Sequence, residues 1–147
     1  MASPVEDLFR EIFGQLPNKG GEAYERLAGI ALHLIAGGSV VHDDKLRGQF
    51  SQTLYQIDAH HRAEDDTSRM AEAKDYSDAE KKVGRPDLQK LGGALPDLPT
   101  IDTGAYFSAT GYTKPAKEYA DAATKSSANQ SGFMSCGQLL RKIMRES

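Results

Sequence analysis

The sequence has little cysteine and no long apolar run. Its one cysteine, Cys136, excludes an internal disulfide and a zinc site built from several thiolates. No apolar stretch approaches the roughly 18 to 20 residues that a membrane-spanning helix needs. The first residues also lack the basic, then apolar, then small-residue layout of a secretory signal. We therefore expect a cytoplasmic protein with no membrane association, and we interpret Cys136 as a core residue.

Positive charge is also scarce over most of the chain. The 147 residues carry 18 Lys and Arg against 21 Asp and Glu, which gives a net charge of −3. Only residues 114–147 are basic, with six Lys and Arg against three Asp and Glu. An acidic balance is unfavourable for a protein that binds only by neutralising phosphates. It is compatible with carboxylates gathered around a divalent cation, because the ion inverts the local field.

The hydrophobic pattern predicts a single domain, residues 1–147, of alternating helices and strands. Capping residues at Ser3 and Pro4 predict a helix over 3–14. Apolar residues at helical spacing, from Tyr24 to Leu34 and Ile35, predict a second helix that ends at Gly37-Gly38. The other predicted strands are 39–42, 49–61, 68–74 and 103–111, and the other predicted helices are 85–98, 113–123 and about 136–146. This order predicts an α/β sandwich with a mixed central sheet.

The segment SRMAEAK, residues 68–74, carries an acid and a base inside an otherwise apolar strand. Side chains alternate along a strand, so Glu72 and Lys74 face the same side. The preceding strand ends with a second acid, Asp58. Two adjacent strands can bring Asp58 and Glu72 close enough to share a cation, and hard cations such as Mg²⁺ prefer oxygen ligands. A buried structural ion triad is the alternative interpretation.

The tripeptide acid-x-Lys is not specific by itself. It also occurs as Asp43-x-Lys45 and Glu80-x-Lys82. The pair at Glu80 lies in a polar run that fits a solvated face, and the pair at Asp43 follows an apolar helix with no acid on a preceding strand. The context of Glu72, rather than the tripeptide, therefore favours a site.

Five segments of the chain, taken together, resemble a known family. They are GEAYERL, YQIDAHHR, AEAKDY, VGRPDLQKLGGAL and GAYFSATGYTKPAKEYADAA, and they span about residues 20–124. In this order and spacing they resemble the Mrr-like restriction endonuclease domains of the PD-(D/E)xK nuclease superfamily. The resemblance implies a restriction-endonuclease-like three-layer sandwich, with a mixed central sheet flanked by helices. Ile57 precedes Asp58 where the superfamily name has proline, which makes the motif less specific.

The resemblance implies a role for each matching residue. Asp58 and Glu72 would be metal ligands, with the carbonyl of Ala73 as a third, and Lys74 would orient or help to deprotonate the attacking water. Glu25 would be an auxiliary acid at the edge of the site, and Gln89 a catalytic polar residue near the cleft.

Other interpretations remain open for several of these side chains. Glu22 lies on nearly the same helix face as Glu25 and competes with it. Gln89 also fits an ordinary helix surface. His60 and His61 follow one another on a strand and face opposite sides, so we interpret them as a solvated pair rather than as zinc ligands or a general base.

The function implied by the resemblance is that of a Mg²⁺-dependent DNA endonuclease of the restriction type, with Mn²⁺ as a substitute and 5′-phosphate ends as products. A homodimer is expected for double-strand cleavage, and DNA recognition could belong to a separate domain or subunit. The alternatives are a nuclease resembling Holliday-junction resolvases, and a non-catalytic module that binds nucleic acid or protein. The candidate backbone contacts are Lys114, Lys117, Lys125, Arg141, Lys142 and Arg145.

Overall fold

The computed structural model describes residues 4–126 and 132–135. Within them, helices and strands alternate in the predicted way. The elements are α1 (Pro4–Phe13), α2 (Glu22–Ala36), β1 (Ser39–Arg47), β2 (Leu54–Arg62), β3 (Ser68–Lys74), α3 (Arg85–Ala94), a 3-10 turn (Leu95–Asp97), β4 (Thr103–Ser108), α4 (Lys114–Ser126) and β5 (Gly132–Ser135).

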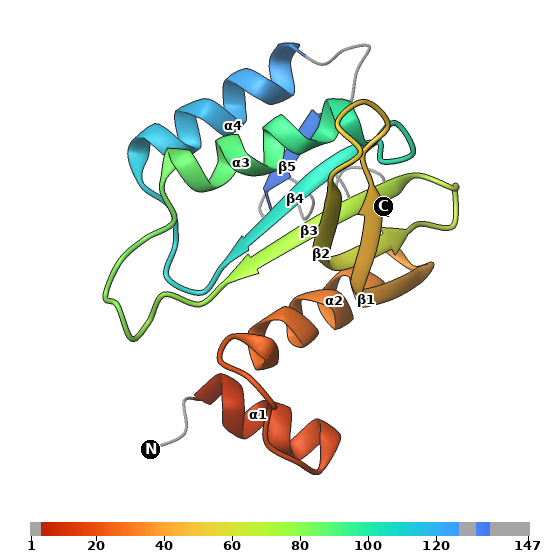
Figure 1. Ribbon diagram of the computed structural model, residues 1–147. Coiled ribbons are helices and arrows are strands. Elements are labelled where there is room, and N and C mark those ends of the chain that lie inside the picture. Colours follow the sequence, from red (N-terminus) through yellow and green to blue (C-terminus); the bar gives the residue numbers. More distant parts are fainter. Residues whose placement is uncertain (1–3, 127–131, 136–147) are drawn as a thin grey trace.

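The described strands form one five-stranded sheet in the order β1-β2-β3-β4-β5. β1, β2 and β3 pair antiparallel, whereas β4 pairs parallel with both β3 and β5. Helices α3 and α4 lie on one side of the sheet and α2 on the other, with α1 beside α2 (Figure 1). The predicted sandwich with a mixed central sheet is therefore confirmed. The sequence interpretation missed β5 and made β1 too short.

The second helix ends where the sequence predicts. Gly37 adopts a positive φ of 65°, and its amide donates to the carbonyl of His33 at 2.9 Å. The buried stripe includes Ala28 and Leu32, but Leu34 is 77% exposed. The sheet covers only one side of this helix, and Leu34 lies away from it.

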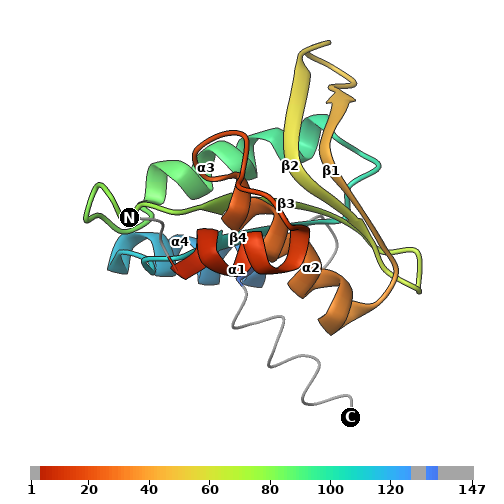
Figure 2. The ribbon, with the colours of Figure 1, turned by 90° about the horizontal axis from the view of Figure 1, so that it is seen from below.

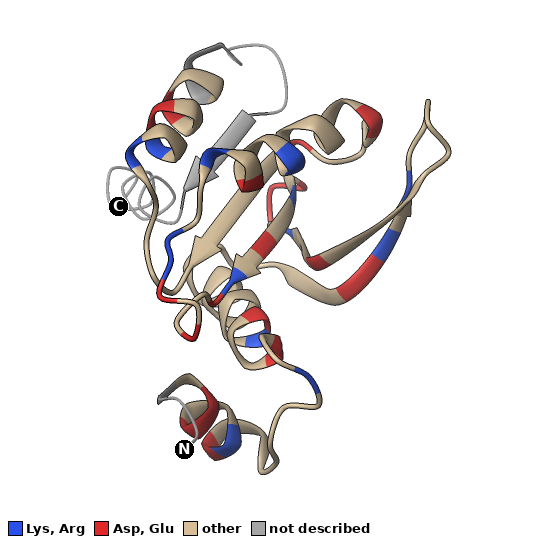
Figure 3. Cartoon of the chain, turned by 60° about the vertical axis from the view of Figure 1, so that its left-hand side comes forward, with Lys and Arg blue, Asp and Glu red and all other residues tan. Residues whose placement is uncertain are grey.

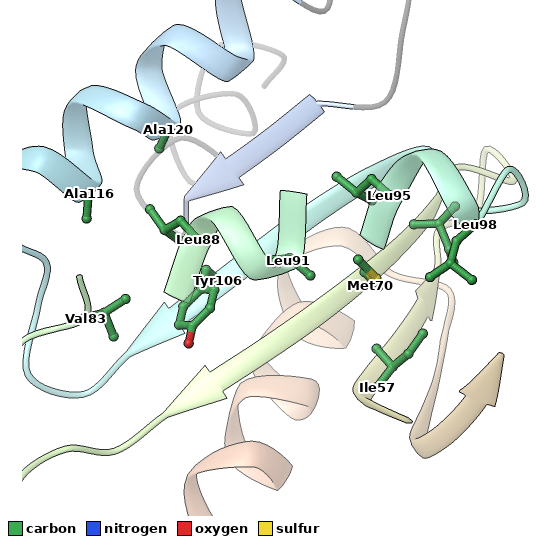
Figure 4. Close-up of a cluster of buried hydrophobic side chains, with 11 residues drawn as sticks. Ile57, Met70, Val83, Leu88, Leu91, Leu95, Leu98, Tyr106, Ala116 and Ala120 are labelled. Atoms are coloured by element: carbon green, nitrogen blue, oxygen red, sulfur yellow. The ribbon is translucent and has the colours of Figure 1, made fainter. Parts of the chain in front are cut away.

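The larger core lies between α3, α4 and the sheet. Leu88, Leu91 and Leu95 are buried, and they pack on Met70 of β3 and Tyr106 of β4 (Figure 4). Helix α4 begins at a cap, because the amide of Ala116 donates to the hydroxyl of Thr113 at 3.3 Å. These contacts fix α3 over the strand that carries Glu72.

The opposite face of the sheet is built from small side chains. Ala59, Ala71, Ala73 and Ala105 form a buried cluster with Leu32 of α2. Small residues let a helix lie close to a sheet, so β3 is covered on both sides. As a result, the alternate residues of β3 project into the space beneath α3.

The β1–β2 hairpin extends beyond the body of the molecule at its turn (Figure 2). The turn closes where the amide of Gly48 donates to the carbonyl of Thr53 at 2.8 Å. No helix in the described part of the chain has the length and apolar character needed to cross a membrane.

The expectations for His60 and His61 and for the C-terminal residues have different outcomes. His61 is fully buried and His60 half-buried, so the interpretation of a solvated pair is wrong: both rings belong to the hydrogen-bonded interior of the sheet. The predicted C-terminal helix at about 136–146, Cys136 and the basic residues Arg141, Lys142 and Arg145 lie outside the described residues.

Candidate active site

The site lies where β2 and β3 separate. Their ladder runs from Arg62 paired with Ser68 to Ala59 paired with Ala71 and then stops. In this register, Asp58 and Glu72 would form the next pair. They are therefore the first two residues of the opening between the strands, and both project to the side opposite the alanine cluster.

Asp58 bridges the opening. Its Oδ2 atom accepts a hydrogen bond of 2.9 Å from the backbone amide of Ala73. The carboxyl of Asp58 also lies within hydrogen-bonding reach of Glu72. Burial, and next the negative charge and hydrogen bond of Asp58, raise the pKa of Glu72 to about 8, while Lys74 and Lys90 act in the opposite direction. The structure thus places two carboxyls so close together that the negative charge of Asp58 opposes the ionisation of Glu72.

The two carboxyls line an open cleft of about 340 Å³. Lys74, two residues after Glu72 on the same face of β3, lines it as well. Side chains of both strands, of β4 and of α3 complete the wall. The lining residues are Tyr55, Gln56, Ile57, Asp58, Met70, Glu72, Lys74, Asp87, Lys90, Leu91, Ala94 and Tyr106.

Helix α3 faces the cleft with one stripe. Asp87, Lys90, Leu91 and Ala94 follow the spacing i, i+3, i+4 and i+7, which places them on one helical face. Gln89 is not among the residues that line the cleft, and it is exposed. The polar side chains that α3 contributes to the cleft are therefore Asp87 and Lys90, and Lys90 lies one position after the residue named from the sequence.

Asp87 is already engaged in structural contacts. Its Oδ2 accepts from the amide of Gly84 at 3.0 Å and its Oδ1 accepts from the hydroxyl of Tyr76 at 3.1 Å. The ammonium of Lys81 lies 4.2 Å from the centre of the Tyr76 ring. These contacts tie the loop after β3 to the start of α3 and fix one wall of the cleft.

Glu25 lies close enough to influence the site without lining the cleft. Burial, and next the charge of Asp58, raise its pKa, although the ammonium of Lys19 lies 3.5 Å away. Glu22, the competing acid, accepts from the amides of Asn18 and Lys19. Glu22 therefore holds the segment that precedes its helix, and Glu25 is the acid nearer to the site.

His60 and His61 are hydrogen-bonded to residues that do not line the cleft. His60 makes hydrogen bonds of 2.8 Å to Asp44 and 2.7 Å to Ser68, and His61 makes one of 2.8 Å to the carbonyl of Gly37. Within residues 4–126 and 132–135, no three His, Cys, Asp or Glu side chains are grouped to hold a metal ion. Any cation at Asp58 and Glu72 would therefore need backbone or water oxygen to complete its ligands.

The comparisons with known proteins agree with this geometry. The model of the Mrr_cat restriction endonuclease family matches residues 51–128, just over half of the chain. The chain belongs to this restriction endonuclease family. The match includes the strands and helix that line the cleft. No curated protein matches the sequence.

Two solved structures are similar to this restriction endonuclease family member. A protein of unknown function, AF1548, has a TM-score of 0.60 and 14% identity, over 82% of this chain and 65% of the other. A repair endonuclease from Pyrococcus abyssi has a TM-score of 0.48 and 10% identity, over 82% of this chain and 49% of the other. The first of these confirms the restriction-endonuclease-like fold. The chain spans less than two thirds of the length of either.

Sequence reasoning named Asp58, Glu72 and Lys74, and the structure brings all three to one cleft. It missed Lys90 and Gln56. The signal for Lys90 was present, because it lies on the same helical stripe as Leu91. The signal for Gln56 was present as well, because alternation along β2 places it on the same face as Asp58.

Proposed function

We propose that this chain is a divalent-cation-dependent DNA endonuclease that hydrolyses phosphodiester bonds, as restriction enzymes of the Mrr type do. The observation that carries the proposal is the pair Asp58 and Glu72, within hydrogen-bonding reach at the mouth of an open cleft that also contains Lys74 and Lys90. Family membership supports the same chemistry.

The donor set fits a hard divalent cation. Two carboxyls meet in a half-buried setting that raises the pKa of Glu72, so a cation between them would relieve a repulsion that the fold itself creates. Asp58 and Glu72, with the carbonyl of Ala73, would hold Mg²⁺, or Mn²⁺ in its place. Such a small set is usual for Mg²⁺, which keeps several of its waters. When bound, the ion supplies positive charge to the scissile phosphate and acidifies a nearby water.

The lysines would act on the reacting groups directly. Lys74, on the same strand face as Glu72, would position the attacking water and help to remove its proton. Lys90, on the opposite wall, would bind a non-bridging phosphate oxygen and offset the charge that develops during in-line attack. Glu25 would support Asp58 from the edge as an auxiliary acid, since the charge of Asp58 raises the pKa of Glu25.

DNA is the proposed substrate, and the exposed Lys114 and Lys117 at the start of α4 are proposed backbone contacts. One site cuts one strand, so double-strand cleavage would need two copies of the chain. Recognition of a sequence or modification would belong to another domain or subunit.

The test is incubation of supercoiled plasmid with the protein, with Mg²⁺ or with a chelator. We expect nicked and linear products with Mg²⁺ alone, and none from the Glu72→Ala or Asp58→Ala proteins. Cleavage of equal rate in chelator, or by Glu72→Ala, would contradict the proposal. If the folded wild type binds DNA but never cuts it, the chain is a non-catalytic module. A clear preference for four-way over linear DNA would indicate a junction-resolving enzyme.

A further inference from the structure

The turn between β1 and β2 is held by one buried carboxylate. Asp97, at the end of the 3-10 turn after α3, is only 8% exposed. Its Oδ1 accepts from the amides of Phe50 at 2.7 Å and Ser51 at 3.1 Å. Its Oδ2 accepts from the hydroxyls of Ser51 and Tyr55, the latter at 3.0 Å. These four hydrogen bonds fasten the turn to the body of the protein.

Further contacts make this attachment rigid. A Cβ at Gly48 would lie 2.0 Å from Asp97 Oδ2, so the close approach requires glycine at that position. The amide of Gln49 also donates to the carbonyl of Asp97 at 2.8 Å. Hydrogen bonds, the one from Ser51 foremost, lower the pKa of Asp97 to about 2, so its charge persists at neutral pH.

The ring of Phe50 is left in solvent by the same arrangement. Its backbone amide is anchored, yet its side chain is 77% exposed. Folding gains almost nothing from a ring in this position. A fixed backbone that presents an exposed aromatic ring is suited to contact something outside the chain.

The charges of the hairpin favour a nucleic acid as that partner. From Lys45 to Ile57 the chain has two cations, Lys45 and Arg47, and no acid. Both cations are exposed, and Arg47 donates to the carbonyl of Gln52 at 2.8 Å. Figure 3 shows where the charged residues lie along the chain. An aromatic ring flanked by cations matches a partner with stacked bases and phosphates.

The turn also lies near the cleft. β2 leads from the turn to Asp58, and Tyr55, Gln56 and Ile57 line the cleft on the way. The four residue-to-residue steps of strand from Leu54 to Asp58 span roughly 13 Å. Phe50 lies further along the same hairpin, about four or more base-pair steps of 3.4 Å from a phosphate at the cleft.

We propose that Phe50 inserts against a base of the bound nucleic acid and stabilises it in an unstacked state, with Lys45 and Arg47 on the flanking phosphates. This inference rests on the proposed function, because it takes DNA as the ligand of the cleft. Apolar wedges between base steps are a known physical means of bending duplexes, and stacking on an aromatic ring offsets the cost of unstacking.

The test uses duplexes and four-way junctions that carry 2-aminopurine at successive positions, in the presence of a chelator. The fluorescence of 2-aminopurine rises when the base loses its stacking neighbours. We expect a several-fold rise with wild type at one position or more, and loss of the rise with Phe50→Ala. DNA binding by Phe50→Ala should be about 5- to 100-fold weaker, and Phe50→Trp should retain both properties.

Leu54→Ala is the matched control, because Leu54 is 52% exposed on the same hairpin and lies outside the cleft lining. It should behave as wild type. Equal fluorescence and binding in Phe50→Ala and wild type would overturn the inference, even if plasmid cleavage occurs normally. So would unchanged DNA binding together with altered self-association of Phe50→Ala, which would assign the ring to a protein contact. If the wild type unstacks a base through Phe50 but cuts no DNA, the nuclease proposal is refuted and the inference about Phe50 still holds.

Discussion

The carboxylate of Asp58 accepts a hydrogen bond of 2.9 Å from the backbone amide of Ala73, across the point where β2 and β3 separate. This bond takes the place of the ladder pairing that ends one residue earlier. It orients Asp58 toward Glu72, and it depends only on backbone and on one oxygen. Residue 73 can therefore be small and buried while its neighbours on either side, Glu72 and Lys74, line the cleft.

Lys74 and Lys82 offer a matched comparison, because each follows an acid by two residues. Lys74 lines the cleft, whereas Lys82 is exposed in the loop after β3. Lys74→Ala should lower kcat for plasmid cleavage at least about 100-fold, the usual effect of removing a positioned acid–base or charge-stabilising group. Lys82→Ala should stay within about twofold. Equal rates for Lys74→Ala and wild type would remove the lysine from the mechanism.

The structure and the sequence interpretation name different residues of α3 for the cleft: the structure gives Lys90, whereas the sequence interpretation gave Gln89. Only Lys90 lies on the cleft stripe of α3. Lys90→Ala should lower kcat/KM roughly tenfold, which corresponds to about 1.4 kcal/mol for a charge partly screened by solvent. Gln89→Ala should leave kcat/KM unchanged. If initial-rate measurements give a larger loss of kcat/KM for Gln89→Ala than for Lys90→Ala, the helix presents a different face to the DNA.

His61 predicts a pH dependence of stability. Burial lowers its pKa below the ordinary value of 6.5, so the unfolded chain binds a proton more readily than the folded one. Stability should therefore be fully present above pH 6.5 and should fall as the pH decreases below it, by at most about 1.4 kcal/mol per pH unit. Urea midpoints at pH 7.5 and 5.5 measure the effect. His61→Gln should show a smaller difference between the two, and an equal difference would assign the loss to other groups.

Asp97 should contribute to stability through the hairpin turn. Asp97→Ala leaves the amides of Phe50 and Ser51 without their acceptor, at a cost of about 1–3 kcal/mol in the free energy of unfolding. Amide hydrogen exchange at these two residues should accelerate more than exchange in β3. Asp97→Asn, which keeps one acceptor oxygen, should lose less. Unchanged exchange at Phe50 would show that the turn is held by other contacts.

The sequence predicted the strand-borne part of the site because strand periodicity is simple. Alternation alone places Glu72 and Lys74 together, and small residues mark the buried side of β3. The exit of Asp58 from the ladder could not be predicted, since it depends on where two strands diverge in space.

Helices gave less reliable predictions of direction. One residue changes the direction of a side chain by about 100°, so Lys90 lines the cleft whereas Gln89, the residue implied by the resemblance, does not. The burial of His61 depends on Gly37 of another element, a contact that no local pattern encodes. Tertiary contacts of this kind determine which polar side chains are buried, and local sequence patterns do not predict them.

The most direct test of the central claim is calorimetric titration of Mn²⁺ or Mg²⁺ into the metal-free protein at pH 7.5. The account predicts saturable binding that releases protons, because Glu72 must ionise to bind, and loss of this heat in Asp58→Asn and Glu72→Gln. Asp58→Asn retains an oxygen that can accept from Ala73, so the strands should remain in place. No binding by wild type at millimolar metal, or equal binding by wild type and both variants, would contradict it.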